Sequence, residues 1–340
     1  MRIREFKADR MRIFNRYIGV AVWVTVILLS VTVLPTGAIA SGPVLNATAG
    51  GESLMQAVPS VSAVGYLQAP EGSTQIQNPI GSRLVSPNLT TPDLFDISVN
   101  IVGGLTPSQQ AIFTQAEELW ESVIIGYQPG VDFYGSLVIN AEGAAIDGVG
   151  GVLGSAGPTF VGWGGGFLVA VEGDMTFDSA DLANMENNGT LADVIAHEMG
   201  HVIGLGTLWS SAGVGIPGYQ EVYADGTGQY TGSAALEAYK SEFNQPLATF
   251  VPVELGGGTG TANGHWNEVD GGAGLTGITN AGGKDMRNEL MTGWLNDPTF
   301  MSQTTISSFE DIGYLVVPEP ATMSLLAMGG LALVRRRRRA

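Results

Sequence analysis

The 340-residue chain contains no cysteine and only three histidines. Without cysteine the protein can form no disulfide and can offer no thiolate to a metal ion. The same absence excludes latency in which a pro-segment cysteine binds the metal of an inactive protease. Glycine, in contrast, is abundant at 49 residues, which predicts many loops and tight turns held by contacts other than disulfides.

Basic residues are nearly absent from the body of the chain. Residues 41–318 hold four lysines and arginines against 29 acidic residues, a net charge of −25, whereas the whole chain carries −17. Such a surface repels nucleic acid and anionic membranes, so we expect no nucleic-acid partner. The composition is typical of a soluble exported protein, and bound calcium is a further use for some of these acids.

The N-terminal residues 1–40 have the pattern of a signal peptide. Six basic residues precede an apolar run over residues 17–34, and residues 38–40 (Ala-Ile-Ala) supply the small side chains of a cleavage site. This predicts export and cleavage by a signal peptidase. The apolar run is also long enough for an uncleaved membrane anchor, which stays open as an alternative.

Residues 41–92 are rich in Gly, Ser, Pro, Ala and Gln and show little periodicity, which predicts a linker or a pro-segment. From residue 93 the pattern changes to that of a folded domain. Alternation and apolar runs predict strands at residues 95–101, 137–139 and 167–171. Helices are expected from residue 106 to 123, over 234–243 and over 304–312.

Two of the histidines stand in the run His197-Glu198-Met199-Gly200-His201. Residues four apart project from one face of a helix, so His197 and His201 can bind one metal ion together. Glu198 lies between them, where a carboxylate can reach a metal-bound water without binding the metal. A third ligand would leave one position open for water and substrate, as in catalytic zinc sites. The pattern predicts a zinc peptidase with one Zn²⁺ per chain. His265 is the remaining histidine and therefore a candidate for the third ligand.

The last 24 residues, 317–340, differ in character from the rest. The run Val317-Pro318-Glu319-Pro320 precedes mostly apolar residues 321–334 and five arginines at 335–339. Fourteen residues span about 21 Å as a helix, less than the roughly 30 Å hydrocarbon core of a bilayer. The order resembles the PEP-CTERM sorting signal of Gram-negative bacteria. The resemblance implies processing by an exosortase-type enzyme, transient anchoring in the inner membrane, and delivery to the cell surface or beyond. An ordinary tail anchor is the alternative.

Metzincin peptidases extend HExxH to HExxHxxGxxH. Here His201 and Gly204 keep that spacing, but Thr207 stands where the third histidine is expected. A long insertion between this glycine and the third histidine is typical of the leishmanolysin-like metzincins, and the chain resembles them from about residue 95 to 316. The matching stretches are residues 175–182, the His197 helix with 208–209, and residues 265–268, 289–293 and 309–314.

This resemblance implies an α+β fold over residues 93–316, with a twisted mixed sheet, an active-site helix and a Gly-rich C-terminal subdomain. It implies that His197, His201 and His265 bind zinc. Glu198 would then be the general base as a zinc-bound water attacks a peptide bond of a protein or peptide substrate.

Two further residues take roles through the same resemblance. Met291 would form the Met-turn, an apolar floor beneath the metal, and Gly204 would let the chain turn back after the helix. Metzincins generally hold an extended peptide along an edge strand, and residues 173–178 are the candidate for that edge.

Several alternatives stay open at this point. In a gluzincin-type peptidase the third ligand is a downstream glutamate, for which Glu237 is the candidate. A non-catalytic surface or matrix protein that binds zinc is the other alternative. Asp193 could orient the His197 ring or be a solvated helix residue, and Asp178 and Asp181 are weak candidates for calcium.

Overall fold

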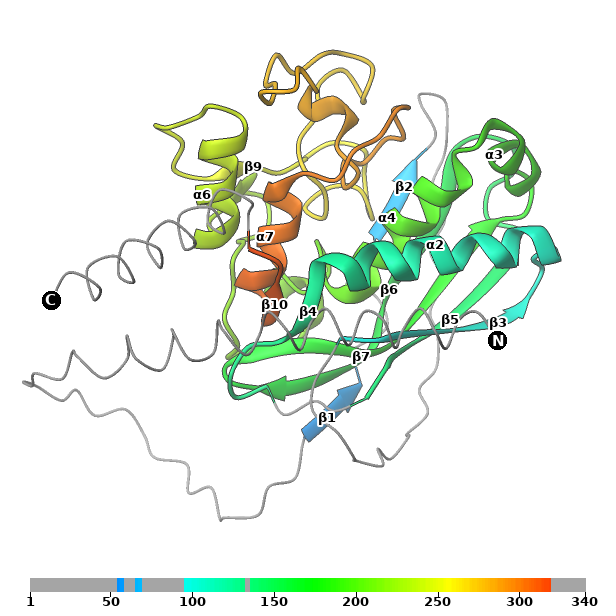
Figure 1. Cartoon of the computed structure of the whole chain (residues 1–340), viewed down its shortest axis with the longest axis horizontal. Helices are drawn as coiled ribbons and strands as arrows, with labels where there is room; N and C mark the ends of the chain where they lie inside the picture. Colours follow the sequence, from blue (N-terminus) through cyan, green and yellow to red (C-terminus); the bar gives the residue numbers. More distant parts are fainter. Residues whose placement is uncertain (1–53, 58–64, 69–94, 132–134, 319–340) are drawn as a thin grey trace, which may run out of the picture. The chain divides into compact units, whose positions relative to one another are not determined.

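The computed structural model describes residues 54–57, 65–68, 95–131 and 135–318; the predicted signal peptide and most of the sorting segment lie outside the described residues. The elements, labelled as in Figure 1, are β1 (Leu54–Ala57), β2 (Gly65–Gln68), β3 (Ile97–Gly103), α2 (Pro107–Val123), β4 (Ile124–Tyr127), β5 (Leu137–Ala144), β6 (Val152–Gly164), β7 (Phe167–Asp178), α3 (Leu182–Asn188), α4 (Leu191–Ile203), α5 (Ser211–Val214), β8 (Gln229–Tyr230), α6 (Ser233–Glu242), β9 (Val251–Pro252), η1 (Met286–Asn288), α7 (Gln303–Asp311) and β10 (Tyr314–Val316).

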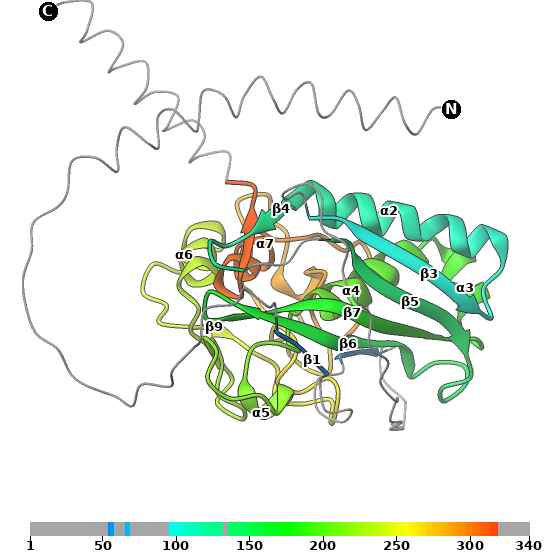
Figure 2. The same ribbon diagram turned by 90° about the horizontal axis from the view of Figure 1, so that it is seen from below.

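A mixed sheet forms the base of the fold. Its order is β1-β6-β7-β5-β3, and β2 also pairs with β6. Strands β3, β5 and β7 are parallel neighbours, whereas β6 runs antiparallel to β7. The protein is therefore an α+β molecule with a twisted mixed sheet, as expected from the sequence (Figures 1 and 2).

Helix α2 begins where its capping residues predict. The Thr106 side chain accepts a hydrogen bond from the Gln109 N–H, and the Gln109 side chain accepts one from the Thr106 N–H, which completes a capping box. Pro107 occupies the first turn, where its missing N–H costs nothing. The buried face of α2 packs on α4, and the Trp120 indole donates to the carbonyl of Ala196 at 2.8 Å.

Helix α4, which carries His197 and His201, lies between α2 and the sheet strands β6 and β7 (Figures 1 and 2). Every residue from 194 to 203 is buried. A helix that is apolar on all sides is stable only when it is covered on all sides. Two histidines and a glutamate on such a helix are therefore removed from bulk water.

The sequence predicted strand β3 and helices α2, α6 and α7 close to their observed bounds. It predicted where β5 and β7 begin, but both strands extend well beyond the expected residues 137–139 and 167–171. Strand β6 was not predicted. Its sequence, VLGSAGPTFVGWG, contains four glycines and a proline that interrupt any strand pattern. The expectation that residues 173–178 form a free edge was wrong. They belong to β7, which is paired with β5 on one side and with β6 on the other.

The outer strand on this side is β6, and its outer edge is paired with β1 and β2. Both short strands come from the 41–92 segment that the sequence indicated as a linker or pro-segment. Parts of that segment thus add to the sheet of the folded body.

The glycine-rich region after α4 folds around an aromatic cluster. The Trp209 ring lies 4.9 Å from both Trp266 and Tyr230, centroid to centroid, and all three are fully buried. Helices α6 and α7 pack together beside this region. The Tyr314 hydroxyl donates to the carbonyl of Ile203 at 2.6 Å, which ties β10 to the end of α4. Buried rings and hydrogen bonds hold loops that a disulfide would hold in a cysteine-containing chain.

Candidate metal centre

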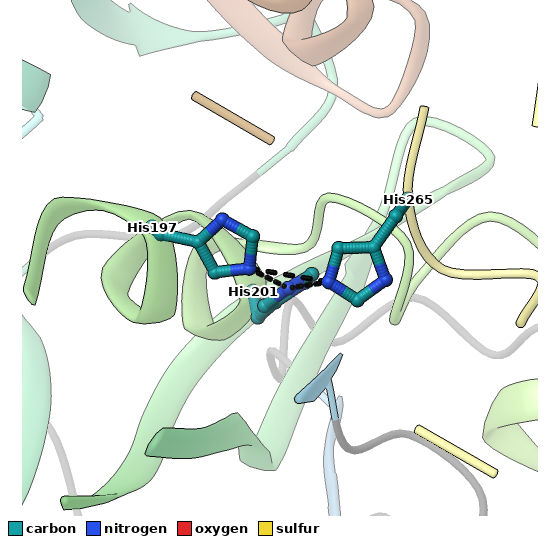
Figure 3. A group of neighbouring side chains, drawn as sticks. All are labelled: His197, His201 and His265. Atoms are coloured by element: carbon teal, nitrogen blue, oxygen red, sulfur yellow. Dashed lines mark hydrogen bonds between the residues drawn. The ribbon is translucent and has the colours of Figure 1, made fainter. Parts of the chain in front are cut away.

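The three histidines converge on one point. His197 and His201 project from the same face of α4, and His265 arrives from the loop between β9 and η1. The Nε2 atoms lie 2.9 Å apart for His197 and His201, 2.9 Å for His201 and His265, and 3.1 Å for His197 and His265. Figure 3 shows the three ring tips directed at one another. Among the described residues, this is the group of side chains that could hold a metal ion.

Each ring is oriented by a backbone carbonyl that faces its second nitrogen, Nδ1. Nδ1 of His197 lies 2.6 Å from the oxygen of Leu290, Nδ1 of His201 lies 2.8 Å from that of Leu205, and Nδ1 of His265 lies 2.8 Å from that of Thr261. A carbonyl oxygen only accepts, so the proton of each neutral imidazole belongs on Nδ1. Three Nε2 lone pairs then face one another, an arrangement that a cation between them stabilises.

Burial keeps these rings neutral. All three histidines are fully buried. Loss of hydration lowers the pKa of His201 to about 4. It also lowers the pKa values of His197 and His265 well below the usual range, and the neighbouring histidines lower them further. Neutral imidazole is the form that binds a metal ion, so at neutral pH the ligands need not lose protons first.

The spacing suits a small ion that prefers nitrogen. Tetrahedral zinc with bonds of about 2.0–2.1 Å needs ligand nitrogens about 3.3 Å apart, close to the observed separations. Calcium prefers six to eight oxygen ligands at longer distances, and the cluster offers three nitrogens. The residues therefore fit zinc and do not fit calcium.

Glu198 is fully buried beside the cluster, under strand β6. Gly154 of β6 lies against it: a side-chain Cβ at that position would lie 2.8 Å from Glu198 Oε1. Only glycine leaves room for the carboxylate there. This contact was not predicted from the sequence, because β6 itself was not predicted.

Met291 forms an apolar floor against α4. Its side chain packs on Gly200, where an added Cβ would lie 2.8 Å from Met291 Cε. Gly200 lies one residue before His201, so Met291 supports the part of the helix that holds the ligands.

A buried carboxylate fixes that floor, and its role was not predicted. Glu289 accepts hydrogen bonds from the N–H of Met291 at 2.6 Å, from the N–H and hydroxyl of Ser302, and from the hydroxyl of Thr305. The Thr305 hydroxyl also accepts from the indole of Trp266, the neighbour of His265. Glu289 thereby joins the segment beneath the metal centre to α7 and to the His265 loop.

The turn after α4 brings the chain to the His265 loop. Gly204 ends the helix with φ 135° and Gly206 follows with φ 74°, values that side chains disfavour. A Cβ on Gly206 would collide with the backbone of Gly264, next to His265. Thr207, at the position where metzincins carry a histidine, donates its hydroxyl to the carbonyl of His201 at 2.6 Å.

Other predicted residues do not reach the cluster. The Glu237 carboxylate is 73% exposed and forms an ion pair with Lys240 at 2.7 Å, so it is not placed to be a third ligand. Asp193 hydrogen-bonds with the side chain of Thr299. The alternative in which Asp193 orients His197 is wrong, because the carbonyl of Leu290 does so.

The candidate calcium ligands have backbone partners. Asp178 accepts from the N–H groups of Asp147, Gly148 and Ala180, and Asp181 accepts from that of Gly150. These hydrogen bonds fix the loop between β5 and β6 and explain why carboxylates stand there.

Comparison with known protein families gives one match: the PEP-CTERM protein-sorting motif matches residues 316–339. The motif implies recognition by an exosortase-type sorting enzyme, export, and C-terminal membrane anchoring in Gram-negative bacteria. No curated protein matches the chain. Among the helices of the described residues, none is both long enough and apolar enough to span a bilayer.

Proposed function

We propose that this protein is an exported, zinc-dependent endopeptidase of the leishmanolysin-like metzincin type, acting at the surface of a Gram-negative bacterium or outside it. One observation carries the proposal: three buried, neutral imidazoles converge within 3.1 Å, and Glu198 lies on the same helix between two of them. A purely structural metal site has no use for a buried carboxylate at that position.

The chemistry assigned to the chain follows from this arrangement. His197, His201 and His265 would hold a zinc ion, which when bound would supply the Lewis acidity that polarises a carbonyl and lowers the pKa of water. Glu198 is the general base: it accepts a proton from the attacking water and returns it to the leaving amine. The neighbouring Gly154 keeps room for the carboxylate, and Met291 keeps the helix beneath the ligands in place.

Glu198→Gln in the full chain tests the proposal. The variant keeps the shape of the side chain but loses the base, so we expect zinc content to stay at one per chain while casein cleavage falls about 100-fold or more. Metal analysis and a casein assay on the same preparations measure both quantities.

His265→Ala is the companion variant, and it should lose zinc as well as activity. Should Glu198→Gln cleave casein as fast as the wild type, Glu198 is not the base and the proposed mechanism fails. Zinc binding without any cleavage in the wild type would instead favour a non-catalytic zinc-binding surface protein.

A further inference from the structure

Strand β6 passes over the proposed general base, Glu198, at Gly154. Gly154 of β6 leaves so little space that an added Cβ would lie 2.8 Å from Glu198 Oε1. The opposite edge of β6 is paired with β7. A peptide strand added to the outer edge near residue 154 would therefore lie one strand spacing, about 4.8 Å, from the residue that covers this carboxylate.

That edge is already occupied by the chain itself. Strand β2 (Gly65–Gln68) pairs antiparallel with β6, with Leu67 opposite Gly154 and Tyr66 opposite Ser155. β2 also lies against α4, the helix of His197 and Glu198, as Figure 1 shows. Strand β1, in contrast, pairs with residues 160–163 at the far end of β6.

Strand addition uses backbone N–H and C=O groups that do not depend on the identity of the added segment. Two extended segments therefore cannot occupy the same stretch of edge at once. We propose that residues 65–68 take the strand position of an extended peptide substrate and so inhibit the peptidase from within its own chain. This inference rests on the proposed peptidase function.

The chain has no cysteine with which a pro-segment could bind the metal. Backbone pairing of residues 65–68 with β6 would keep the peptidase inactive without a cysteine. A covalently attached strand competes at an effective concentration in the millimolar range, which makes even a four-residue ladder an effective competitor of dilute substrate. Inhibition of this kind raises the apparent KM and leaves kcat unchanged, because the open form works normally.

Paired proline variants of the full chain test the proposal. Tyr66→Pro/Leu67→Pro removes two consecutive N–H groups, one of which must point at β6 in an antiparallel ladder. Met55→Pro/Gln56→Pro makes the same change in β1 and is the matched control. We expect the β2 variant to lower the KM for casein about tenfold or more at unchanged kcat, and the β1 variant to match the wild type.

A second readout needs no turnover. In the Glu198→Gln background, a fluorescein-labelled peptide of residues 63–70 should bind the β2 variant at least about tenfold more tightly than it binds the β1 variant or the protein with both strands unchanged. Fluorescence anisotropy measures the affinity, and zinc content with circular dichroism verifies folding.

A disulfide lock covers the case in which the prolines unfold the protein. Tyr66→Cys/Ser155→Cys places the chain's two cysteines on directly opposed residues, within reach of a disulfide. We expect the oxidised form to be inactive and to exclude the labelled peptide, and the reduced form to regain both.

The two proposals fail in different ways. The first case is cleavage that depends on Glu198 while KM and peptide binding are equal in all proline variants and in both redox states. This result overturns the inhibitory strand but supports the peptidase function. Differential peptide binding without any casein cleavage removes the peptidase and retains β2 as the occupant of this edge.

Discussion

At the scale of single residues, the candidate metal centre depends on backbone carbonyls that orient its three histidines. Backbone carbonyls of Leu290, Leu205 and Thr261 orient the three imidazoles, and each fixes the proton of its ring on Nδ1. The three histidines can be recognised in the sequence as candidate ligands because side-chain chemistry and spacing single them out. The carbonyls cannot, since every residue has one and only the fold selects which three are used.

Gly154 gives a prediction at this scale. A methyl group at position 154 would lie 2.8 Å from Glu198 Oε1 and would force the carboxylate to move. We expect Gly154→Ala to retain one zinc per chain and to lose about tenfold in kcat, which corresponds to about 1.4 kcal/mol of barrier. Casein kinetics together with metal analysis give both values.

Gly162→Ala on the same strand is the matched control. An added Cβ there meets its nearest neighbour, Val171 Cγ2, at 3.4 Å, an ordinary contact, so activity should stay near that of the wild type. Equal kinetics for the two alanine variants would show that Gly154 does not control the position of Glu198.

At the scale of elements, those with strong local signals were predictable. Helix α2 has its capping box and its apolar stripe, and α4 has its metal-binding spacing. Strand β6 has neither alternation nor β-branched residues in series, and one of its glycines, Gly154, makes room for Glu198. Its pairing on both edges, a tertiary effect, keeps it extended.

The segment beneath the metal centre gives the prediction for elements. Glu289 is fully buried and accepts hydrogen bonds from Met291, Ser302 and Thr305, and burial raises its pKa. Glu289→Ala leaves these donors without a partner, so we expect the free energy of unfolding to fall by about 3–5 kcal/mol. Urea denaturation of the zinc-loaded protein measures the loss.

Glu242→Ala is the control for that measurement. Glu242 also binds α7, through the N–H and hydroxyl of Thr304, but it is only half-buried, so the expected loss is about 1 kcal/mol. A Glu289→Ala variant as stable as Glu242→Ala would rule out a central role for the buried carboxylate.

At the scale of the whole molecule, we expect the free energy of unfolding to depend on pH and on the proposed zinc ion. An unfolded histidine has a pKa of about 6.5, whereas burial lowers the pKa of His201 to about 4 and also lowers the pKa values of His197 and His265. Between these values the unfolded chain binds protons that the metal-free fold does not. The free energy of unfolding of the metal-free protein must therefore fall as pH decreases through this window.

The prediction is a loss on the order of 3 kcal/mol from His201 alone between about pH 6.5 and pH 4. Urea titrations in a chelator at several pH values measure it, and zinc at saturating concentration should raise the stability at neutral pH. In His201→Gln, the dependence of the free energy of unfolding on pH should correspond to about one proton fewer than in the wild type. A chelated wild type whose stability does not change over this range would contradict the neutral, buried state of the rings.

The sequence by itself determined the chemistry that is available. The spacing of His197, Glu198 and His201 follows from helix geometry alone, and the absence of cysteine and the PEP-CTERM segment are properties of the chain. The tertiary structure alone decided which distant groups meet. It brought His265 to the helix of the other two histidines, joined Glu289 to the segment beneath them, and laid β2 along the edge above Glu198. The physical reason is that local patterns record short-range backbone preference, whereas these contacts arise from burial and strand pairing between segments far apart in the chain.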